Sequence, residues 1–309
     1  MAASDILVIG RGCLDHIAVV ARYPHENAKA AILAMRDEGG GQGATGACCI
    51  RRLGAAVRLV GRLGDDPAGR FCRQRLADFG VDHDRVQTIA GGKTPESHIF
   101  VTQATGRRTI FYQSSTLPRL TAADLPPDLF RSAAVVLLDP ETTYLTAHLP
   151  PPGPRAPVII YDAERWRESL EDMMRRADYF IPSSEFFDDP HLNLADLPLN
   201  EQFERLAARI DGTLIVTRGR QGAYFQQDGR LWRVPAPEVN VRDTIGAGDN
   251  FHAAFAVARL RRYDLARAVK FAVAVASLSC RAYGGREGLP TDREAREQAA
   301  TLKVRPVST

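Results

Sequence analysis

Lysine is scarce in this chain of 309 residues. Only four of its 40 basic residues are lysines and the rest are arginines; the lysines are Lys29, Lys93, Lys270 and Lys303. We therefore expect arginine side chains and backbone N–H groups to make most contacts with anions. The formal net charge is only +3, so the composition predicts neither nucleic acid nor a membrane surface as a partner.

Paired cysteines and long apolar runs are also missing. The five cysteines, Cys13, Cys48, Cys49, Cys72 and Cys280, form no Cys-x-x-Cys pair and show no zinc-ligand spacing with histidine. They are expected to be buried, reduced thiols, which favours a cytoplasmic location. No apolar stretch approaches the ~20 residues of a membrane helix, and the N-terminal MAASDILVIGRG lacks the basic start of a signal peptide.

Two common nucleotide-binding motifs are absent. Gly92-Lys93-Thr94 lacks the glycine that a P-loop would place at position 87, which is Gln87. The segment Gly10-x-Gly12-x-x-Asp15 lacks the third glycine of a dinucleotide fingerprint. The sequence thus disfavours a P-loop enzyme and a Rossmann dehydrogenase. His16, His98 and His252 are scattered and are expected to be packed or solvent-facing. Asp162 closes a strand and could touch the edge of the site, although capping is the simpler role.

The chain contains enough apolar residues, 45%, for a sizeable core. From about residue 135 strand-like and helix-like segments alternate, with helical patterns at 164–177, 200–210, 247–262 and 264–283. This order predicts an α/β fold with a doubly wound, mostly parallel sheet covered by helices on both faces. A hairpin of 98–103 and 108–113 interrupts the alternation. We expect one domain over 1–309 with a small β appendage from about 14–38 and 97–114.

The strongest chemical signal is Asp243-Thr244-Ile245-Gly246-Ala247-Gly248-Asp249 at the start of a predicted helix. Gly246 and Gly248 let backbone N–H groups approach an anion, and the helix N-terminus adds unpaired donors. Asp249 would lie beside that anion and could accept the proton of an attacking hydroxyl in phosphoryl transfer. The alternative is that Asp249 only caps the helix.

Four segments in order resemble one family. Asp243 to Phe255 is similar to the C-terminal signature of the ribokinase-like (PfkB-type) carbohydrate kinases, and Gly40 to Ala47, with Leu53-Gly54-Ala55 and Gly61 to Asp66, is similar to the N-terminal one. Gly10 to Asp15 and Thr217 to Ala223 fall where the family has its sugar-binding strand end and its nucleotide loop. The resemblance runs from about residue 5 to 290.

The resemblance implies ATP and Mg²⁺ as cofactors, a sugar substrate and a β lid that closes over it. It implies that Asp249 is the catalytic base and that Gly246, Ala247 and Gly248 form an anion hole. The implied sugar site contains Asp15, Gly40, Gly41 and Thr45. The implied nucleotide site contains Thr217, Gly219, Gly222, Thr244, Gly246, Gly248 and Cys280.

The sequence departs from the family in two places. Thr45 stands where the family commonly has asparagine, so the sugar contacts must differ. The family's Asn-x-x-Glu motif, which helps to organise Mg²⁺, is replaced by Ser184 and Phe187. Glu185 is adjacent and is the candidate metal ligand.

The substrate is less defined than the reaction. Thr94 to Ser97, Gly106 to Ile110 and Ser115 to Pro118 resemble the ketohexokinase branch, and Gly284 to Pro290 resembles bacterial fructose and sulfofructose kinases. The resemblance therefore favours phosphorylation of a primary hydroxyl of a ketose or modified ketose. One alternative is a nucleoside kinase, whose lid could use Phe100, Phe111 and Tyr112. A second is a non-catalytic binding protein that responds to a sugar or nucleotide.

Two expectations concern the appendage itself. Arg107 and Arg108 lie at the hairpin turn, where Arg108 could bind an anionic substrate group or simply be solvated. An exposed sheet edge often pairs across a dimer, which predicts a homodimer formed through the lid.

Overall fold

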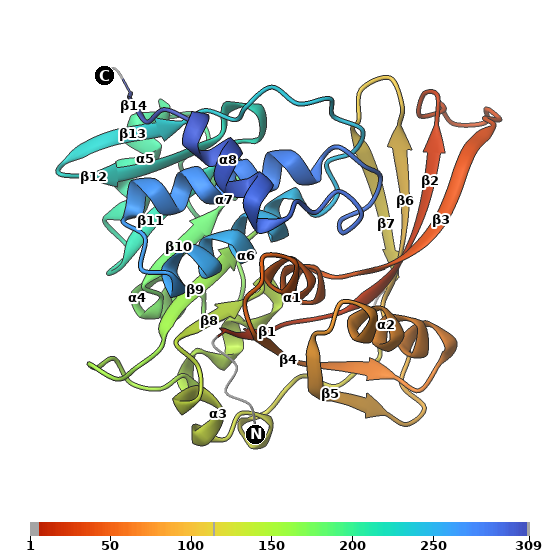
Figure 1. Ribbon diagram of the computed structural model, residues 1–309, viewed down its shortest axis with the longest axis horizontal. Coiled ribbons are helices and arrows are strands. Elements are labelled where there is room, and N and C mark those ends of the chain that lie inside the picture. Colours follow the sequence, from red (N-terminus) through yellow and green to blue (C-terminus); the bar gives the residue numbers. More distant parts are fainter. Residues whose placement is uncertain (1–5, 114, 308–309) are drawn as a thin grey trace.

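A computed structural model describes residues 6–113 and 115–307. Its large sheet contains ten strands (Figure 1). In spatial order they are β14 (Arg305–Pro306), β13 (Arg230–Val234), β12 (Ala223–Gln227), β11 (Thr213–Thr217), β10 (Tyr179–Pro182), β9 (Val158–Ala163), β8 (Val135–Leu138), β1 (Ile6–Ile9), β4 (Val57–Gly64) and β5 (Asp82–Ile89). Pairing is parallel from β5 to β11 and antiparallel from β11 to β14.

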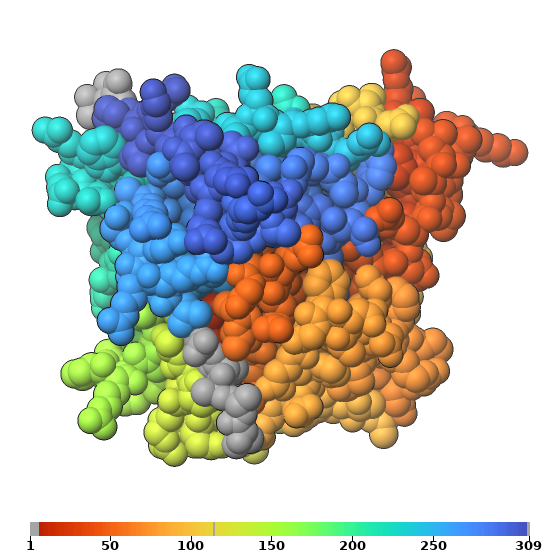
Figure 2. Space-filling view, in the orientation of Figure 1, coloured from red at the N-terminus to blue at the C-terminus, as the bar shows by residue number. Residues whose placement is uncertain are grey.

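Helices cover both faces of this sheet, as the alternation of strands and helices predicts. On β1, Ile6 and Val8 belong to the core on one face, whereas Leu7 and Ile9 belong to the core on the other. The first face carries α1 (Gln42–Arg52), α2 (Pro67–Asp78), α6 (Ala247–Leu260), α7 (Leu265–Ser279) and α8 (Asp292–Thr301). The second carries α3 (Pro127–Arg131), α4 (Leu170–Arg176) and α5 (Leu199–Ala207). Figure 2 shows blue C-terminal segments lying against an orange N-terminal segment, and α1 packs on α6.

The strand order reverses at β1, which pairs with β4 on one side and with β8 on the other. Ligands of such sheets bind outside the carboxyl ends of the strands at this switch point. Here the backbone N–H of Arg11 donates to Oδ2 of Asp139 over 2.6 Å, and a Cβ atom placed on Gly10 would lie 2.5 Å from the same oxygen. The turn that leaves β1 is therefore fixed against the end of β8.

A second sheet stands apart from the first, at the right of Figure 1. Its strands in spatial order are β3 (Ile32–Gly40), β2 (Cys13–Val20), β6 (Glu96–Thr102) and β7 (Arg108–Gln113). β2 pairs antiparallel with β3 and parallel with β6, and β6 pairs antiparallel with β7. Residue 114, the last of the range expected for the appendage, lies outside the described residues.

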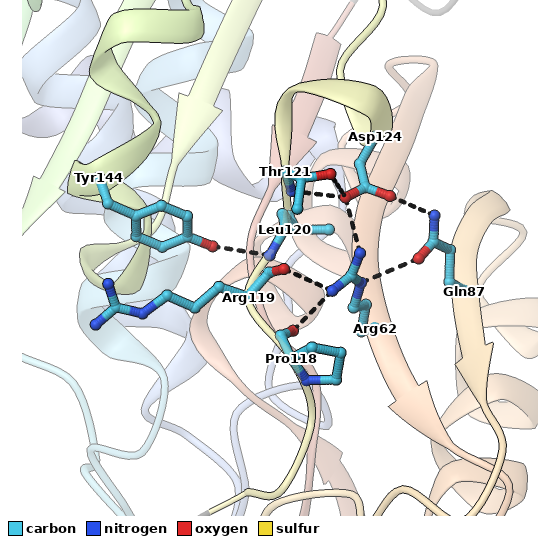
Figure 3. Close-up of polar contacts among 8 residues, drawn as sticks. All are labelled: Arg62, Gln87, Pro118, Arg119, Leu120, Thr121, Asp124 and Tyr144. Carbon is cyan, nitrogen blue, oxygen red and sulfur yellow. Dashed lines mark hydrogen bonds and ion pairs between the residues drawn. The ribbon is translucent and has the colours of Figure 1, made fainter.

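Polar contacts fix the chain where it leaves this second sheet (Figure 3). The guanidinium of Arg62 on β4 is shared among the Gln87 amide oxygen, the Asp124 carboxylate and the carbonyls of Pro118 and Arg119, at 2.5–3.0 Å. The hydroxyl of Tyr144 accepts the N–H of Leu120 at 3.0 Å. Because four acceptors hold one guanidinium, the segment that leads back to the large sheet is anchored to it.

Some local predictions differ from the structure. The helix expected at 164–177 begins only at Leu170, because Ser169 adopts φ 61 and the N–H of Trp166 donates to the Asp189 carboxylate. The helix expected over 264–283 ends at Ser279. The strand β5 and the helix α8 were not predicted, although Thr291 and Glu294 form the capping box typical of a helix start.

Candidate active site

Residues 243–246 form the loop before α6, which we call the anion-hole loop, and this loop leaves backbone donors free. Gly246 precedes the helix with φ 70, and a Cβ atom there would lie 2.8 Å from Cα of Gly285. The Asp243 carboxylate holds the loop, since it accepts the N–H of Ile245 and that of Gly284, both at 2.8 Å. None of the described side chains caps α6. The N–H of Ala247, predicted to line the anion hole, instead donates to the carbonyl of Thr244 at 3.3 Å. In the described part of the chain the N–H groups of Gly248 and Asp249 make no such bond and are thus available to an anion.

Asp249 lies in the first turn of α6, as predicted, and is partly buried. Burial raises the pKa of Asp249 to about 7, and the negative charge of Asp162 adds to the rise. His252 and Arg108 act in the opposite direction. A carboxylate with this proton affinity is suited to accept a proton near neutral pH.

Two further residues lie near Asp249. Asp162, at the end of β9, is interpreted from the sequence as a cap that could touch the edge of the site; burial and then Glu164 and Asp139 raise its pKa well above the usual range. His252 is packed, as expected, and is 3% exposed. Its Nδ1 lies 2.7 Å from the carbonyl oxygen of Gly248 and its Nε2 lies 2.9 Å from that of Ile181. Strand β9 and helix α6 therefore bring a second carboxyl group and an imidazole to the base.

The predicted sugar-site residues lie together where the second sheet joins α1. Asp15 on β2 is buried, its pKa is raised by that burial, and it accepts a hydrogen bond from Sγ of Cys13 at 3.1 Å. A Cβ atom on Gly40 would lie 2.0 Å from Oδ2 of Asp15, so only glycine fits beside that carboxylate. Gly41 has φ 88 and precedes α1.

Thr45 is 3% exposed and packs against the anion-hole loop. Its Cγ2 lies 3.3 Å from the positions that Cβ atoms would occupy on Gly246 and Gly285. The asparagine expected from the family would be longer in a space that is already filled. This packing gives a physical reason for the smaller side chain here.

Arg108 connects the second sheet to the anion-hole loop. Its Nη1 donates to Oγ1 of Thr244 at 2.9 Å, and its charge lowers the pKa of Asp249 and that of Asp243. Arg108 thus lies on the side of the site where the base and the free N–H groups meet. A guanidinium there can stabilise negative charge on a phosphoryl group.

The aromatic residues suggested for a nucleoside lid do not share one face. In the register of the second sheet Asp15, Ser97 and Tyr112 form one row, and His16, His98 and Phe111 form the next. Side chains alternate between faces along a strand. Tyr112 therefore lies on the Asp15 face, whereas Phe111 and Phe100 lie on the opposite face, so Tyr112 alone of the three shares a face with Asp15.

Three of the predicted nucleotide residues, Thr217, Gly219 and Gly222, lie at or just after the end of β11. Thr217 ends β11 beside Ser183, and Gly219 follows with φ 47. Gly222 has φ 88, and a Cβ atom there would lie 1.9 Å from the carbonyl oxygen of Val234, so the hairpin itself requires glycine. Cys280 is buried, and its carbonyl accepts the N–H of Arg242 at 2.8 Å at the base of the anion-hole loop.

The metal-ligand prediction rests on Glu185 alone. This residue is exposed on the short helix η3 (Ser184–Asp188), after β10. In residues 6–113 and 115–307, no group of three or more His, Cys, Asp or Glu side chains is arranged to hold a metal ion. Likewise, no helix in the described part of the chain is long and apolar enough to cross a membrane.

The large, mostly parallel sheet and the small second sheet define a ribokinase-like α/β fold, with Asp249 in the first turn of α6. Residues 3–292 match the family described as pfkB family carbohydrate kinase, and the chain belongs to that family. It is an ATP-dependent sugar kinase. Ribokinase of Bacillus subtilis is 28% identical over 304 residues, covering 95% of this chain and 98% of the relative. Mouse ketohexokinase is 27% identical over 296 residues, covering 91% and 97%.

Solved structures agree on the fold. Ribokinase of Arabidopsis thaliana, complexed with ribose and ATP, superposes with a TM-score of 0.79 at 22% identity, covering 96% of this chain and 99% of that one. Ribokinase of Thermotoga maritima gives the same TM-score at 21% identity, with the same coverage.

Proposed function

We propose that this kinase transfers the γ-phosphoryl group of ATP to a primary hydroxyl of a ketose. The observation that carries the proposal is Asp249, a carboxylate with a pKa of about 7 beside the uncapped start of α6. Asp249 accepts the hydroxyl proton as the oxygen attacks. The free N–H groups and Arg108 stabilise the negative charge of the transferred group.

Substrate binding is assigned to the face of the second sheet that carries Asp15. The short row Asp15, Ser97 and Tyr112 offers a carboxylate, a hydroxyl and an aromatic ring to one ligand. We propose that this sheet closes as a lid over the sugar and excludes water, which would otherwise accept the phosphoryl group. The likeness to mouse ketohexokinase supports a ketose.

A nucleoside is the second candidate substrate. Tyr112 is 65% exposed and Ile110 is 45% exposed, and both lie on the Asp15 face, where an apolar base could stack. A nucleoside kinase of Methanothermobacter thermautotrophicus is 26% identical over 299 residues. A non-catalytic binding protein is disfavoured because such a protein has no use for the base.

Magnesium is proposed to enter with ATP, whose phosphate oxygens are the ligands that this ion prefers. Glu185 is the protein carboxylate that we propose beside it, since it is exposed at the end of β10, near the proposed nucleotide residues. When bound, Mg²⁺ neutralises phosphate charge.

A phosphoryl-acceptor panel tests the proposal. ATP consumption is measured with fructose, sulfofructose, ribose and adenosine, for the wild type, Asp249→Asn and the control Asp188→Asn, an exposed carboxylate on η3. We expect fastest turnover with a ketose and a loss of at least about 10³-fold in Asp249→Asn, with ATP binding retained. Near wild-type turnover in that variant would contradict the role of Asp249. Fastest turnover with adenosine would contradict the ketose proposal and identify a nucleoside as the preferred substrate.

A homodimer through the lid is also proposed. The lid face opposite Asp15 carries the exposed apolar side chains of Met35 and Phe111, each more than half exposed, which we call the outer patch. An apolar patch of this kind on a sheet with two free edges favours association with a second copy. The five cysteines are all unpaired and buried, which supports the proposed cytoplasmic location.

A further inference from the structure

The segment Tyr283–Arg286 runs between the lid and the anion-hole loop, and each of its four residues makes a hydrogen bond. Two bonds go to lid strand β3 and two go to the anion-hole region. They are Arg36 Nη1 to the carbonyl of Tyr283 at 2.8 Å, the N–H of Gly284 to Asp243 at 2.8 Å, Asn250 Nδ2 to the carbonyl of Gly285 at 3.0 Å and the N–H of Arg286 to Glu38 at 3.2 Å.

The packing around this segment leaves little free space. Gly284 has φ +89, and a Cβ atom there would lie 1.8 Å from Oε2 of Glu38. On the other side, a Cβ atom on Gly246 would lie 2.8 Å from Cα of Gly285. Close-packed atoms transmit a displacement rather than absorb it. A shift of β3 would therefore be passed to the anion-hole loop.

The lid end of the segment adjoins the proposed sugar-binding carboxylate. Glu38 pairs directly with Asp15 in the β2–β3 register, and both side chains are buried. Arg286 also holds the strand end, since its Nη2 donates to the carbonyl of Gly40 at 3.1 Å. Its guanidinium passes Gly39, where a Cβ atom would lie 2.6 Å from Nη1. Arg286 thus contacts β3 on both sides of Gly39.

The other end of the segment adjoins the base. Asp243 holds Gly284 with one carboxylate oxygen and Ile245 with the other, so the position of Gly284 and that of the anion-hole loop are linked through one side chain. Asn250, which holds Gly285, directly follows Asp249 on α6. The segment therefore connects the Asp15 region to the Asp249 region through short, ordered contacts.

We propose that Glu38 and Arg286 are positioning residues that couple sugar binding at Asp15 to the alignment of the anion hole, through segment 283–286. This inference rests on the proposed function. Neither side chain contacts the reacting atoms. A sugar bound to Asp15 fixes the end of β3, and the segment then holds the free N–H groups of α6 in place for the phosphoryl group. Such coupling keeps ATP from being hydrolysed before the sugar is bound.

The experiment compares Glu38→Ala, which removes the acceptor of the Arg286 N–H, with Glu38→Gln, which keeps an acceptor oxygen. Glu287→Ala is the control, because it removes an exposed carboxylate one residue beyond the segment. The kinetic readouts are kcat and the ratio of ATP hydrolysed to fructose phosphorylated. In Glu38→Ala we expect kcat to fall about tenfold and that ratio to rise, as for the loss of one well-placed hydrogen bond. Glu38→Gln should remain within about threefold of the wild type.

Hydrogen–deuterium exchange of peptides covering residues 241–249 gives a readout that does not depend on the acceptor. We expect faster exchange there in Glu38→Ala, and wild-type exchange in Glu287→Ala. If Glu38→Ala exchanges faster only in the lid, or only lowers Tm while the hydrolysis ratio stays at the wild-type value, the coupling is refuted and Glu38 is structural. If the wild type phosphorylates no acceptor of the panel, the proposed function fails, and the exchange data still decide the coupling.

Discussion

Nε2 of His252 lies 3.4 Å from Oδ1 of Asp162, at the point where β9 ends and α6 begins. Burial lowers the pKa of His252, which weakens the positive charge that it presents to the nearby carboxyl groups. Burial of Asp249 and the charge of Asp162 outweigh the opposing charges of His252 and Arg108 and hold the pKa of Asp249 near 7. The proton affinity of the base is thus set partly by a residue on another strand.

Replacing Asp162 by asparagine tests this relationship. Removal of a neighbouring negative charge makes ionised Asp249 more favourable, so its pKa falls. Because the base works in its deprotonated form, the acid limb of kcat/KM against pH should move to lower pH. The profile is measured with the preferred acceptor, and Asp172→Asn, an exposed carboxylate on α4, should leave it unchanged. An unmoved limb, or one at higher pH, would contradict the proposed effect of Asp162.

The sequence alone predicted that Asp249 lies in the first turn of a helix, but not what surrounds it, because the surrounding contacts are long-range. Asp243 to Asp249 are consecutive, so their residue types together indicate a loop, a helix start and a candidate base. Asp162 lies near Asp249 only because of the place of β9 in the sheet; its position at a strand end indicated that it could touch the site, but not which residue it would approach. Glu38 likewise meets Arg286 across 248 positions of sequence.

The second sheet shows another limit of prediction from the sequence, which concerns the face on which a side chain lies. Its hairpin was predicted from β-branched and aromatic residues, but those residue types do not say which face meets the substrate. The register with β2 decides that Tyr112 shares a face with Asp15 and that Phe111 does not. Register is set by tertiary packing, which is why the residue types alone could not say which of the aromatic residues share a face with Asp15.

Gly284→Ala and Gly54→Ala form a matched pair. Both glycines have positive φ, +89 and +83, but a Cβ atom on Gly54 meets nothing within 4 Å, whereas one on Gly284 overlaps the Glu38 carboxylate. We expect Gly54→Ala to lower the free energy of unfolding by about 1 kcal/mol through backbone strain alone. Gly284→Ala should cost roughly 3 kcal/mol and also lower kcat. Urea unfolding measures the loss of stability, and an activity assay measures kcat. Equal losses of unfolding free energy in the two variants would show that segment 283–286 accommodates a Cβ atom without strain.

Glu38 predicts a pH-dependent stability. Burial raises its pKa to about 7, against an ordinary value of 4.5, and the charge of Arg286 offsets only part of the rise. The folded state therefore binds a proton that the unfolded state releases, and stability falls as pH rises from about 4.5 to 7. Glu38→Gln has no such proton, so its free energy of unfolding relative to the wild type should increase from pH 5 to pH 8, by on the order of 2 kcal/mol. Glu204→Gln, at an exposed residue of α5, is the control. A constant difference between Glu38→Gln and the wild type would contradict the prediction.

Met35→Glu tests the proposed dimer. Met35 is 68% exposed on β3, so a charge there costs little in a single chain, whereas burial of that charge between two outer patches would be strongly unfavourable. Sedimentation velocity should show a dimer for the wild type and a monomer for Met35→Glu. Gln226→Glu, an exposed residue of β12 outside the lid, adds the same charge and should remain dimeric. A wild type that stays monomeric as its concentration is raised, or a Met35→Glu variant that stays dimeric, would exclude association through the outer patch.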